Sequence, residues 1–296
     1  MQHKLVVAFA ILAILTACAQ RQAGSTATAP AAEPDVLSPL AIDTLAPTTP
    51  DDEEVLVAQP TKADELFDDF IFNYASDPTL QRQRTVFPLP YYKGDTPVHI
   101  ERTDWEHDYL FAQQPCYTLL FDREDDMEMV GDTTLHSVQV EFFPLGSSQV
   151  KKFYFEKKGG AWMLEAINLR QAERDSVATQ TGTKRKESFL EFYARFATDS
   201  VYQLEHIRNP LSYVTLDPDD EFSILETTID AEQWPAFSPA LPTEGLTNIN
   251  YGQRNDDLSR EKILKVNGIG NGFSNVFYFK RRHGEWELYK FEDTGQ

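Results

Sequence analysis

The segment TDWEHDY at 103–109 gathers the side chains best suited to acid–base chemistry or ligand contact. An imidazole, a carboxylate and a phenol follow one another at His107, Asp108 and Tyr109, shortly after the indole of Trp105. Burial in a pocket can bring such groups close to neutrality, where they exchange protons readily. Adjacent residues of a strand point to opposite faces, so they cannot all enter one pocket. A solvated edge is therefore the favoured interpretation, ahead of a ligand contact through Trp105, His107 and Tyr109 and ahead of catalysis.

Two further segments carry side chains that could bind a ligand or a metal ion. Tyr91 and Tyr92 follow a proline and are candidates for a ligand-binding groove, since tyrosines are common in carbohydrate and peptide sites; packing in the core or at an interface is the alternative. The acidic stretch at 122–132 does not fit a calcium loop, because Met127 and Thr133 stand where glycine and glutamate are required. No zinc-type spacing of ligands is found, so neither a metal nor a cofactor is expected.

The first sixty residues predict export and anchoring. An apolar run at 5–15 is too short to span a bilayer and is typical of a signal peptide at 1–17. The letters LTAC that end at Cys18 resemble the bacterial lipobox, which implies a lipid anchor on that cysteine. Residues 18–60 are rich in Ala, Thr and Pro and predict a disordered stalk. Ala19 favours the periplasmic face of the outer membrane.

The composition limits the partners. A formal charge of −20 opposes binding to nucleic acid, so the expected contacts are the membrane, through the lipid, and a small molecule, glycan or protein. Cys116 is the second of only two cysteines, so lipidation of Cys18 leaves no internal disulfide; a buried inert thiol is expected.

The chain contains a duplication. FYFEKKGGAW at 153–162 returns as FYFKRRHGEW at 277–286, and 67–89 aligns with 189–211 at an offset of 122. A period of this length indicates two domains, predicted at 61–172 and 187–296 with a linker at 173–186. His206 and Asn209 replace Arg84 and Phe87 of the first copy, so we expect the second half to have lost a property that the first retains.

Each half predicts a helix pair followed by strands. Helical spacing of apolar residues opens each half, and Asp77 before Pro78 predicts the start of a second helix. Strands are predicted at 115–121, 136–143 and 261–266, where they feed the final hairpin of their own half. In the first hairpin a loop at Gly159–Gly160 should pair Phe155 with Leu164 and Phe153 with Ala166, which predicts an apolar core face of Phe153, Phe155, Trp162 and Leu164, repeated by Phe277, Phe279, Trp286 and Leu288. Tyr154, Tyr278 and Tyr289 lie on the opposite faces and are predicted interface residues.

This order of elements, with Gln81, the FPL of 87–89 and the terminal hairpin, resembles a Bacteroidetes lipoprotein family of unknown function. The resemblance implies an α+β fold of two tandem cone-shaped domains, each a helix pair packed on a curved antiparallel sheet, of the nuclear-transport-factor-2-like type. That fold carries binding modules and enzymes alike. The predicted function is therefore a non-enzymatic binding or scaffold lipoprotein. The alternative is an isomerase, dehydratase or hydrolase that uses the first cone.

Overall fold

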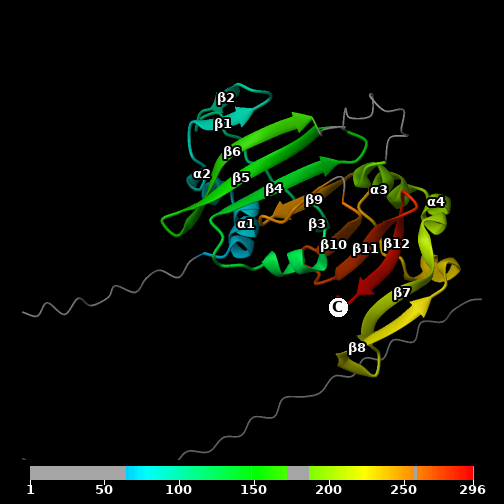
Figure 1. Cartoon of the computed structure of the whole chain (residues 1–296). Coiled ribbons are helices and arrows are strands. Elements are labelled where there is room, and N and C mark those ends of the chain that lie inside the picture. Colours follow the sequence, from blue (N-terminus) through cyan, green and yellow to red (C-terminus); the bar gives the residue numbers. More distant parts are fainter. Residues whose placement is uncertain (1–64, 148, 172–186, 257–258, 296) are drawn as a thin grey trace, which may run out of the picture. The chain divides into compact units, whose positions relative to one another are not determined.

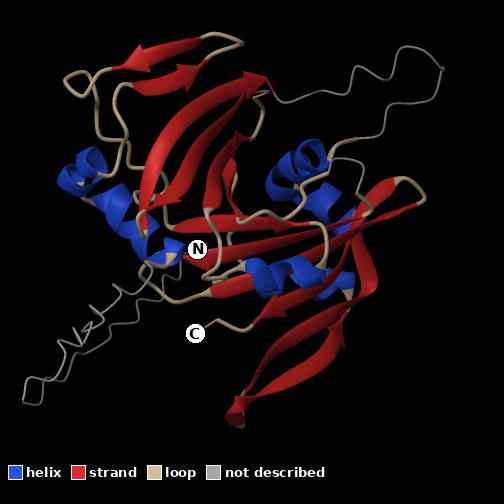
Figure 2. Cartoon of the chain, turned by 60° about the vertical axis from the view of Figure 1, so that its left-hand side comes forward, coloured by secondary structure: helices blue, strands red, loops and turns tan. Residues whose placement is uncertain are grey.

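The computed structural model describes residues 65–147, 149–171, 187–256 and 259–295. The predicted signal peptide, Cys18, the stalk and the linker at 173–186 lie outside these ranges. Strands are the commonest regular structure in the described chain, and short helices lie beside them (Figures 1 and 2). Within the same ranges, no helix has the length and apolar character needed to cross a membrane.

Each half opens with the predicted helix pair. In the first half, α1 (Phe67–Ser76) is followed by α2 (Pro78–Gln83), and in the second half α3 (Phe189–Thr198) is followed by α4 (Ser200–Glu205). The side chain of Asp77 accepts hydrogen bonds from two backbone N–H groups of α2, and Asp199 does the same for α4. These caps satisfy donors that a helix start leaves unpaired. The prediction of a second helix beginning at Pro78 is confirmed.

The strands form two sheets of six. The order of the first sheet is β2 (Pro97–Ile100), β1 (Leu89–Tyr92), β6 (Ala161–Gln171), β5 (Gln149–Lys158), β4 (Ser137–Pro144) and β9 (Gly245–Asn250). The order of the second is β8 (Asp220–Ile229), β7 (Ile207–Asp217), β12 (Glu285–Asp293), β11 (Ser274–Arg282), β10 (Glu261–Gly268) and β3 (Cys116–Phe121). The 3₁₀ turns η1 (Glu124–Met129) and η3 (Ala231–Gln233) and the short α5 (Trp234–Phe237) complete the described elements.

The two sheets have the same plan. Strand by strand, β2, β1, β6, β5 and β4 of the first half correspond to β8, β7, β12, β11 and β10 of the second. In each sheet, the strand after the helix pair runs parallel to the last strand of the half, as β1 does beside β6 and β7 beside β12. The expectation of a wholly antiparallel sheet therefore needs a correction at this one pairing per sheet. The physical reason is that the last strand of each half, β6 or β12, lies beside the strand that followed the helices, β1 or β7, and runs in the same direction.

The halves exchange one strand each. β3 belongs to the first half but pairs with β10, and β9 belongs to the second half but pairs with β4. The prediction that 115–121 joins the hairpin of its own half is therefore wrong. The apolar periodicity of a strand does not reveal which sheet the strand joins, because β3 and β9 would bury their apolar side chains in either one. Each sheet is built by both halves, and a boundary at 173–186 separates the repeats of the sequence without separating the sheets.

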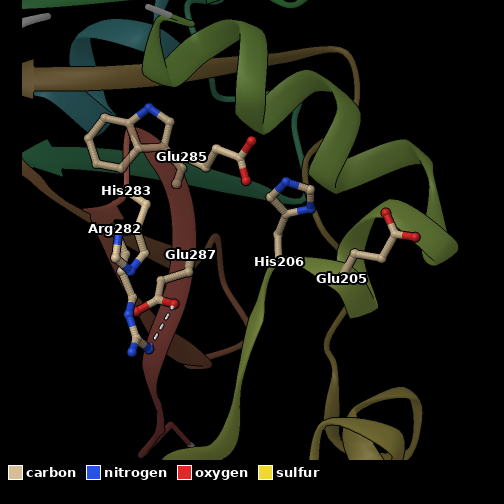
Figure 3. A pocket seen from close by; sticks show the side chains of 7 residues that line it. Glu205, His206, Arg282, His283, Glu285 and Glu287 are labelled. Atoms are coloured by element: carbon tan, nitrogen blue, oxygen red, sulfur yellow. Dashed lines mark ion pairs between the residues drawn. The ribbon is translucent and has the colours of Figure 1, made fainter.

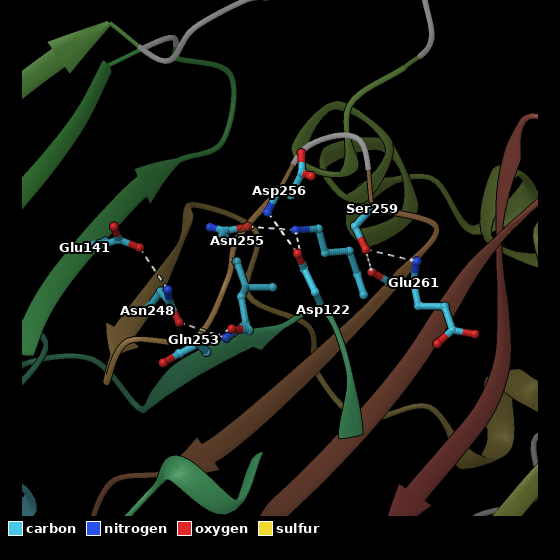
Figure 4. A network of polar contacts seen from close by, with 10 residues as sticks. Asp122, Glu141, Asn248, Gln253, Asn255, Asp256, Ser259 and Glu261 are labelled. Carbon is cyan, nitrogen blue, oxygen red and sulfur yellow. Dashed lines mark hydrogen bonds and ion pairs between the residues drawn. The ribbon is translucent and has the colours of Figure 1, made fainter. Parts of the chain in front are cut away.

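Polar groups hold the exchanged strands against each other and against their hosts (Figure 4). The backbone N–H of Leu120 in β3 donates to the Asn248 side chain of β9 at 2.9 Å, and Asn248 donates to the buried carboxylate of Glu141 in β4 at 2.8 Å. In the second sheet, the Lys262 ammonium of β10 donates to Asp122, directly after β3, at 2.6 Å. Buried groups of this kind need partners, so the exchange is specified by hydrogen bonding as well as by packing.

The hairpins have the predicted core faces and a register that differs beyond the tip. Phe155 pairs with Leu164 as expected, but Phe153 pairs with Ile167 instead of Ala166. A β-bulge between Tyr154 and Phe155 inserts the extra residue, and the second hairpin has the same shift between Tyr278 and Phe279. Such a bulge bends the strand, which the sequence pattern does not encode. All eight predicted core-face residues are buried: Phe153, Phe155, Trp162, Leu164, Phe277, Phe279, Trp286 and Leu288.

Candidate functional site

A hollow of about 370 Å³ opens on the second half (Figure 3). Its walls come from the end of α4, the tip of the β11–β12 hairpin and the start of β12. The lining residues are Glu205, His206, Arg282, His283, Glu285, Trp286 and Glu287. They offer carboxylates, two imidazoles, a guanidinium and an indole, so the site is equipped to bind a polar group.

Local structure fixes the position of His206. Its backbone carbonyl accepts a hydrogen bond of 2.8 Å from the N–H of Leu288, which ties the end of α4 to β12. Its ring packs on Tyr202, at 3.8 Å between centroids, and near Phe192 at 5.7 Å. Nδ1 lies 2.7 Å from the carbonyl oxygen of Tyr202. A carbonyl can only accept, so Nδ1 carries a hydrogen and donates it to this oxygen.

The carboxylates of the hollow are unequally matched by cations. The Glu287 carboxylate forms ion pairs with Arg208 at 2.5 Å and with Arg282 at 3.9 Å. Glu205 and Glu285 form no hydrogen bond or ion pair within the described ranges, and Figure 3 shows them on either side of His206. The hollow therefore holds negative charge that its own walls do not neutralise.

Burial and nearby carboxylates raise the pKa of Tyr202, which packs against His206 beside the hollow. Burial, reinforced by the carboxylates of Glu187 and Glu285, raises the pKa of Tyr202 to about 12. Tyr202 also donates to Glu187 at 3.4 Å and stacks under Arg195, whose guanidinium carbon is 3.8 Å from the ring centroid. A phenol that stays neutral and stacked gives His206 a rigid support.

The first half contains a salt bridge at the corresponding place. Arg84 is the counterpart of His206, and its carbonyl accepts from the N–H of Leu164 at the same 2.8 Å. The Arg84 guanidinium forms a two-pronged pair with Glu65, at 3.1 and 3.2 Å, and donates to the carbonyl of Trp162. The shorter imidazole of His206 cannot repeat these contacts. The two halves therefore differ at this place by a specific exchange, a salt bridge in the first half and a hollow in the second.

The tryptophans of the two hairpins show the same contrast. The Trp162 indole N–H donates to the carbonyl of Glu65 at 2.9 Å. The counterpart carbonyl, that of Glu187, accepts from Arg281 at 2.7 Å. Trp286, at 1% exposure, lines the hollow, and its indole nitrogen has no hydrogen-bond partner in the described part of the chain. A buried N–H without a partner costs free energy and is uncommon in folded proteins.

The segment at 103–109 lies in the first half, away from this lining. Gln81 is fully buried and exchanges hydrogen bonds with the backbone of Asp108, at 2.7 and 2.9 Å, which fixes the loop. Asp108 itself pairs with Lys151 at 2.6 Å. His107 packs against the exposed Tyr109 at 4.4 Å.

Trp105 is separate from that pair, because it is buried and packs against Phe87 at 6.0 Å. The buried nitrogens Trp105 Nε1 and His107 Nε2 have no hydrogen-bond partner among the described residues. Tyr91 and Tyr92 are half-buried in β1, where Lys93 lies 4.9 Å from the Tyr91 ring. The structure therefore brings His107 and Tyr109 together and leaves the other candidates in separate elements.

The predicted interface tyrosines lie at different depths. Tyr278 is buried in the core cluster of the first half, and Tyr289 packs against the same cluster, although both belong to the second half. Tyr154 is half-buried in β5 and belongs to neither core cluster. Cys116 is a free half-buried cysteine, and burial raises the pKa of its thiol. Among the described residues, no cluster of three or more His, Cys, Asp or Glu is placed to hold a metal ion.

Sequence reasoning did not select the acidic residues of the hollow. Glu205, Glu285 and Glu287 stand where the first copy has Gln83, Ala161 and Met163. The duplication carries a signal for these residues. Three uncharged positions of the first copy are glutamates in the second, and the nearby Arg84 is replaced by His206. Such a combined change of charge marks a change of role. Only the fold shows that these separate changes meet.

The comparisons agree with this architecture. A family model described as "Domain of unknown function (DUF4348)" matches residues 51–293. A crystal structure described as an NTF2-like protein from Bacteroides fragilis NCTC 9343, at 2.15 Å resolution, is 60% identical in sequence and superposes with a TM-score of 0.73, covering 80% of this chain and 100% of that one. No curated protein matches the chain. The chain belongs to the DUF4348 family of unknown function, and its fold is α+β and nuclear-transport-factor-2-like.

Proposed function

We propose that the protein is a lipid-anchored protein of the cell envelope that binds a ligand without transforming it, and that the hollow of the second half is the binding site. The observation that carries the proposal is the contrast between the halves. Arg84 and Glu65 form a salt bridge in the first half, and the corresponding place in the second is an open hollow with unmatched carboxylates. The anchor rests on the lipobox-like segment that ends at Cys18, and the periplasmic face of the outer membrane rests on Ala19.

Aromatic packing supports a preformed binding site. Phe192, Phe279 and Trp286 are buried, Phe192 is in ring contact with the other two, and Trp286 lines the hollow, which gives it a rigid wall. The lining has no hydroxyl or thiol, and its carboxylates face an open space of about 370 Å³. Sites that bind by charge and shape need such a preformed wall.

Two measurements test the proposal. The full chain, expressed in a bacterium that matures lipoproteins, should incorporate an alkyne-labelled fatty acid, and Cys18→Ser should remove the label. The detergent-solubilised full chain should then show a thermal shift with at least one member of a panel of amines, amino acid amides, glycans and peptides, and a variant of the hollow should abolish that shift. Silence against the whole panel, or a shift that no variant of the hollow alters, would contradict the binding site.

A further inference from the structure

We propose that the hollow of the second half binds a guanidinium group, such as the side chain of an arginine-containing ligand. This inference rests on the proposed function and adds the chemical class of the ligand. The internal duplication supports it, because the first half shows how the same fold fills the place that the hollow occupies in the second half.

The backbone frame is the same in the two halves. The carbonyls of Arg84 and His206 both accept a 2.8 Å hydrogen bond, from the leucine two residues after the hairpin tryptophan. Beneath each lies a phenylalanine of the first helix. The Arg84 guanidinium carbon is 5.8 Å from the Phe70 ring centroid, and the His206 ring is 5.7 Å from that of Phe192. The frame that holds a guanidinium in the first half is therefore preserved in the second.

The second half has lost the cation of this frame and gained carboxylates around it. Arg84 becomes His206, a shorter side chain that is not permanently charged. In the same place Gln83, Ala161 and Met163 of the first copy become the three glutamates of the lining: Glu205, Glu285 and Glu287. These changes shift the site in one direction, toward an acceptor of positive charge. A guanidinium suits such a set because its five N–H donors match carboxylates bidentately.

The cations already present leave part of the charge unmatched. Arg208 and Arg282 both pair with Glu287. Glu205 and Glu285 form no ion pair within the described ranges, and Nδ1 of His206 donates to the carbonyl of Tyr202. Figure 3 shows Glu205 and Glu285 on either side of His206, and the two carboxylates line the hollow as acceptors. A ligand that donates several N–H groups satisfies them together.

A second and independent observation comes from Trp286. The indole is 1% exposed, lines the hollow and has an unpartnered N–H in the described part of the chain, whereas its counterpart Trp162 has the Glu65 carbonyl as partner. A ligand that carries a carbonyl beside its cationic group, as an arginine amide does, supplies an acceptor as well as donors. The hollow is therefore suited to a guanidinium compound with a polar carbonyl.

The test is calorimetric titration of the solubilised full chain with arginine amide and, in parallel, with citrulline amide, which has the same shape without the charge. We expect arginine amide to bind with a Kd below about 1 mM and citrulline amide to bind at least tenfold more weakly. Glu285→Gln and Glu205→Gln should each weaken arginine amide by at least tenfold. Glu226→Gln, on the exposed part of β8, is the matched control and should leave the Kd unchanged.

The outcomes separate the inference from the proposed function. Equal binding of the two amides, or no effect of either glutamate variant at unchanged melting temperature, overturns the guanidinium assignment. Binding of a neutral ligand that responds to the glutamate variants, with no binding of arginine amide, overturns the assignment and keeps the hollow as a binding site. Failure of every ligand in the wider panel overturns both.

Discussion

The buried pair of Lys262 and Asp122 gives the sharpest test of the strand exchange. Lys262 in β10 of the second half is 1% exposed, and Asp122, directly after β3 of the first half, is 8% exposed. Lys262→Met removes the ammonium and leaves the carboxylate with the backbone N–H of Asp256 at 2.9 Å. Breaking a buried pair on one side costs about 3–5 kcal/mol. Because one donor remains, we expect the lower end, about 3 kcal/mol.

The assay is urea and thermal unfolding of the full chain at pH 7. For a folded part of this size, a loss of about 3 kcal/mol lowers the melting temperature by about 6–12 °C. Lys265→Met is the matched control, because Lys265 lies on the same strand, is only half-buried and has no ion pair among the described residues; we expect a change within about 0.5 kcal/mol. Adding Asp122→Asn to Lys262→Met should recover more than half of the loss. Equal effects of Lys262→Met and Lys265→Met would refute the exchange as described.

Three further predictions follow from particular residues. His283 has a φ of 53° at the hairpin tip, where the first copy has Gly159 with a φ of 57°, so His283→Gly should stabilise the chain by about 1 kcal/mol in urea unfolding; an unchanged midpoint would argue against the left-handed conformation. The pKa of Tyr202 is raised to about 12, mainly by burial, above the ordinary value of about 10, so its stabilising contribution is complete below pH 10 and is lost as the pH rises from 10 to 12. Tyr202→Phe should flatten that decline in unfolding midpoints measured from pH 9 to pH 11, and an equal decline would contradict the assignment. Burial raises the pKa of the Cys116 thiol, so in a Cys18→Ser chain maleimide should label it more slowly at pH 7 in the folded state than in urea, by about tenfold or more; equal rates would show an exposed thiolate.

The features that the sequence predicts are the ones set by local chemistry. Asp77 before Pro78 caps α2 because both residues act within one turn of their own helix. The buried faces of the hairpins follow from alternation, as Phe155 opposite Leu164 shows. The nuclear-transport-factor-2-like fold was predicted from the order of such elements, together with their repetition.

The features that the sequence does not predict depend on distant partners. β3 enters the sheet of the other half by pairing with β10, where Leu120 lies opposite Leu264, a residue far away in the sequence. The bulge beside Tyr154 shifts the register by one residue without a pattern of its own. The hollow arises because substitutions at 205–206 and 285–287 meet in space. The candidates at 103–109 differ for the opposite reason, since neighbours in sequence such as Trp105 and His107 pack against different rings, Phe87 and Tyr109.

We propose that the second half binds its ligand at the place where the first half has its Arg84–Glu65 salt bridge. The most direct measurement is the affinity of arginine amide for the His206→Arg variant, which restores the side chain of the first copy beside Glu285. We expect His206→Arg to weaken the binding of arginine amide at least tenfold. The unfolding midpoint of the variant should equal or exceed that of the unaltered chain. Unchanged affinity in a folded His206→Arg protein would contradict the proposal.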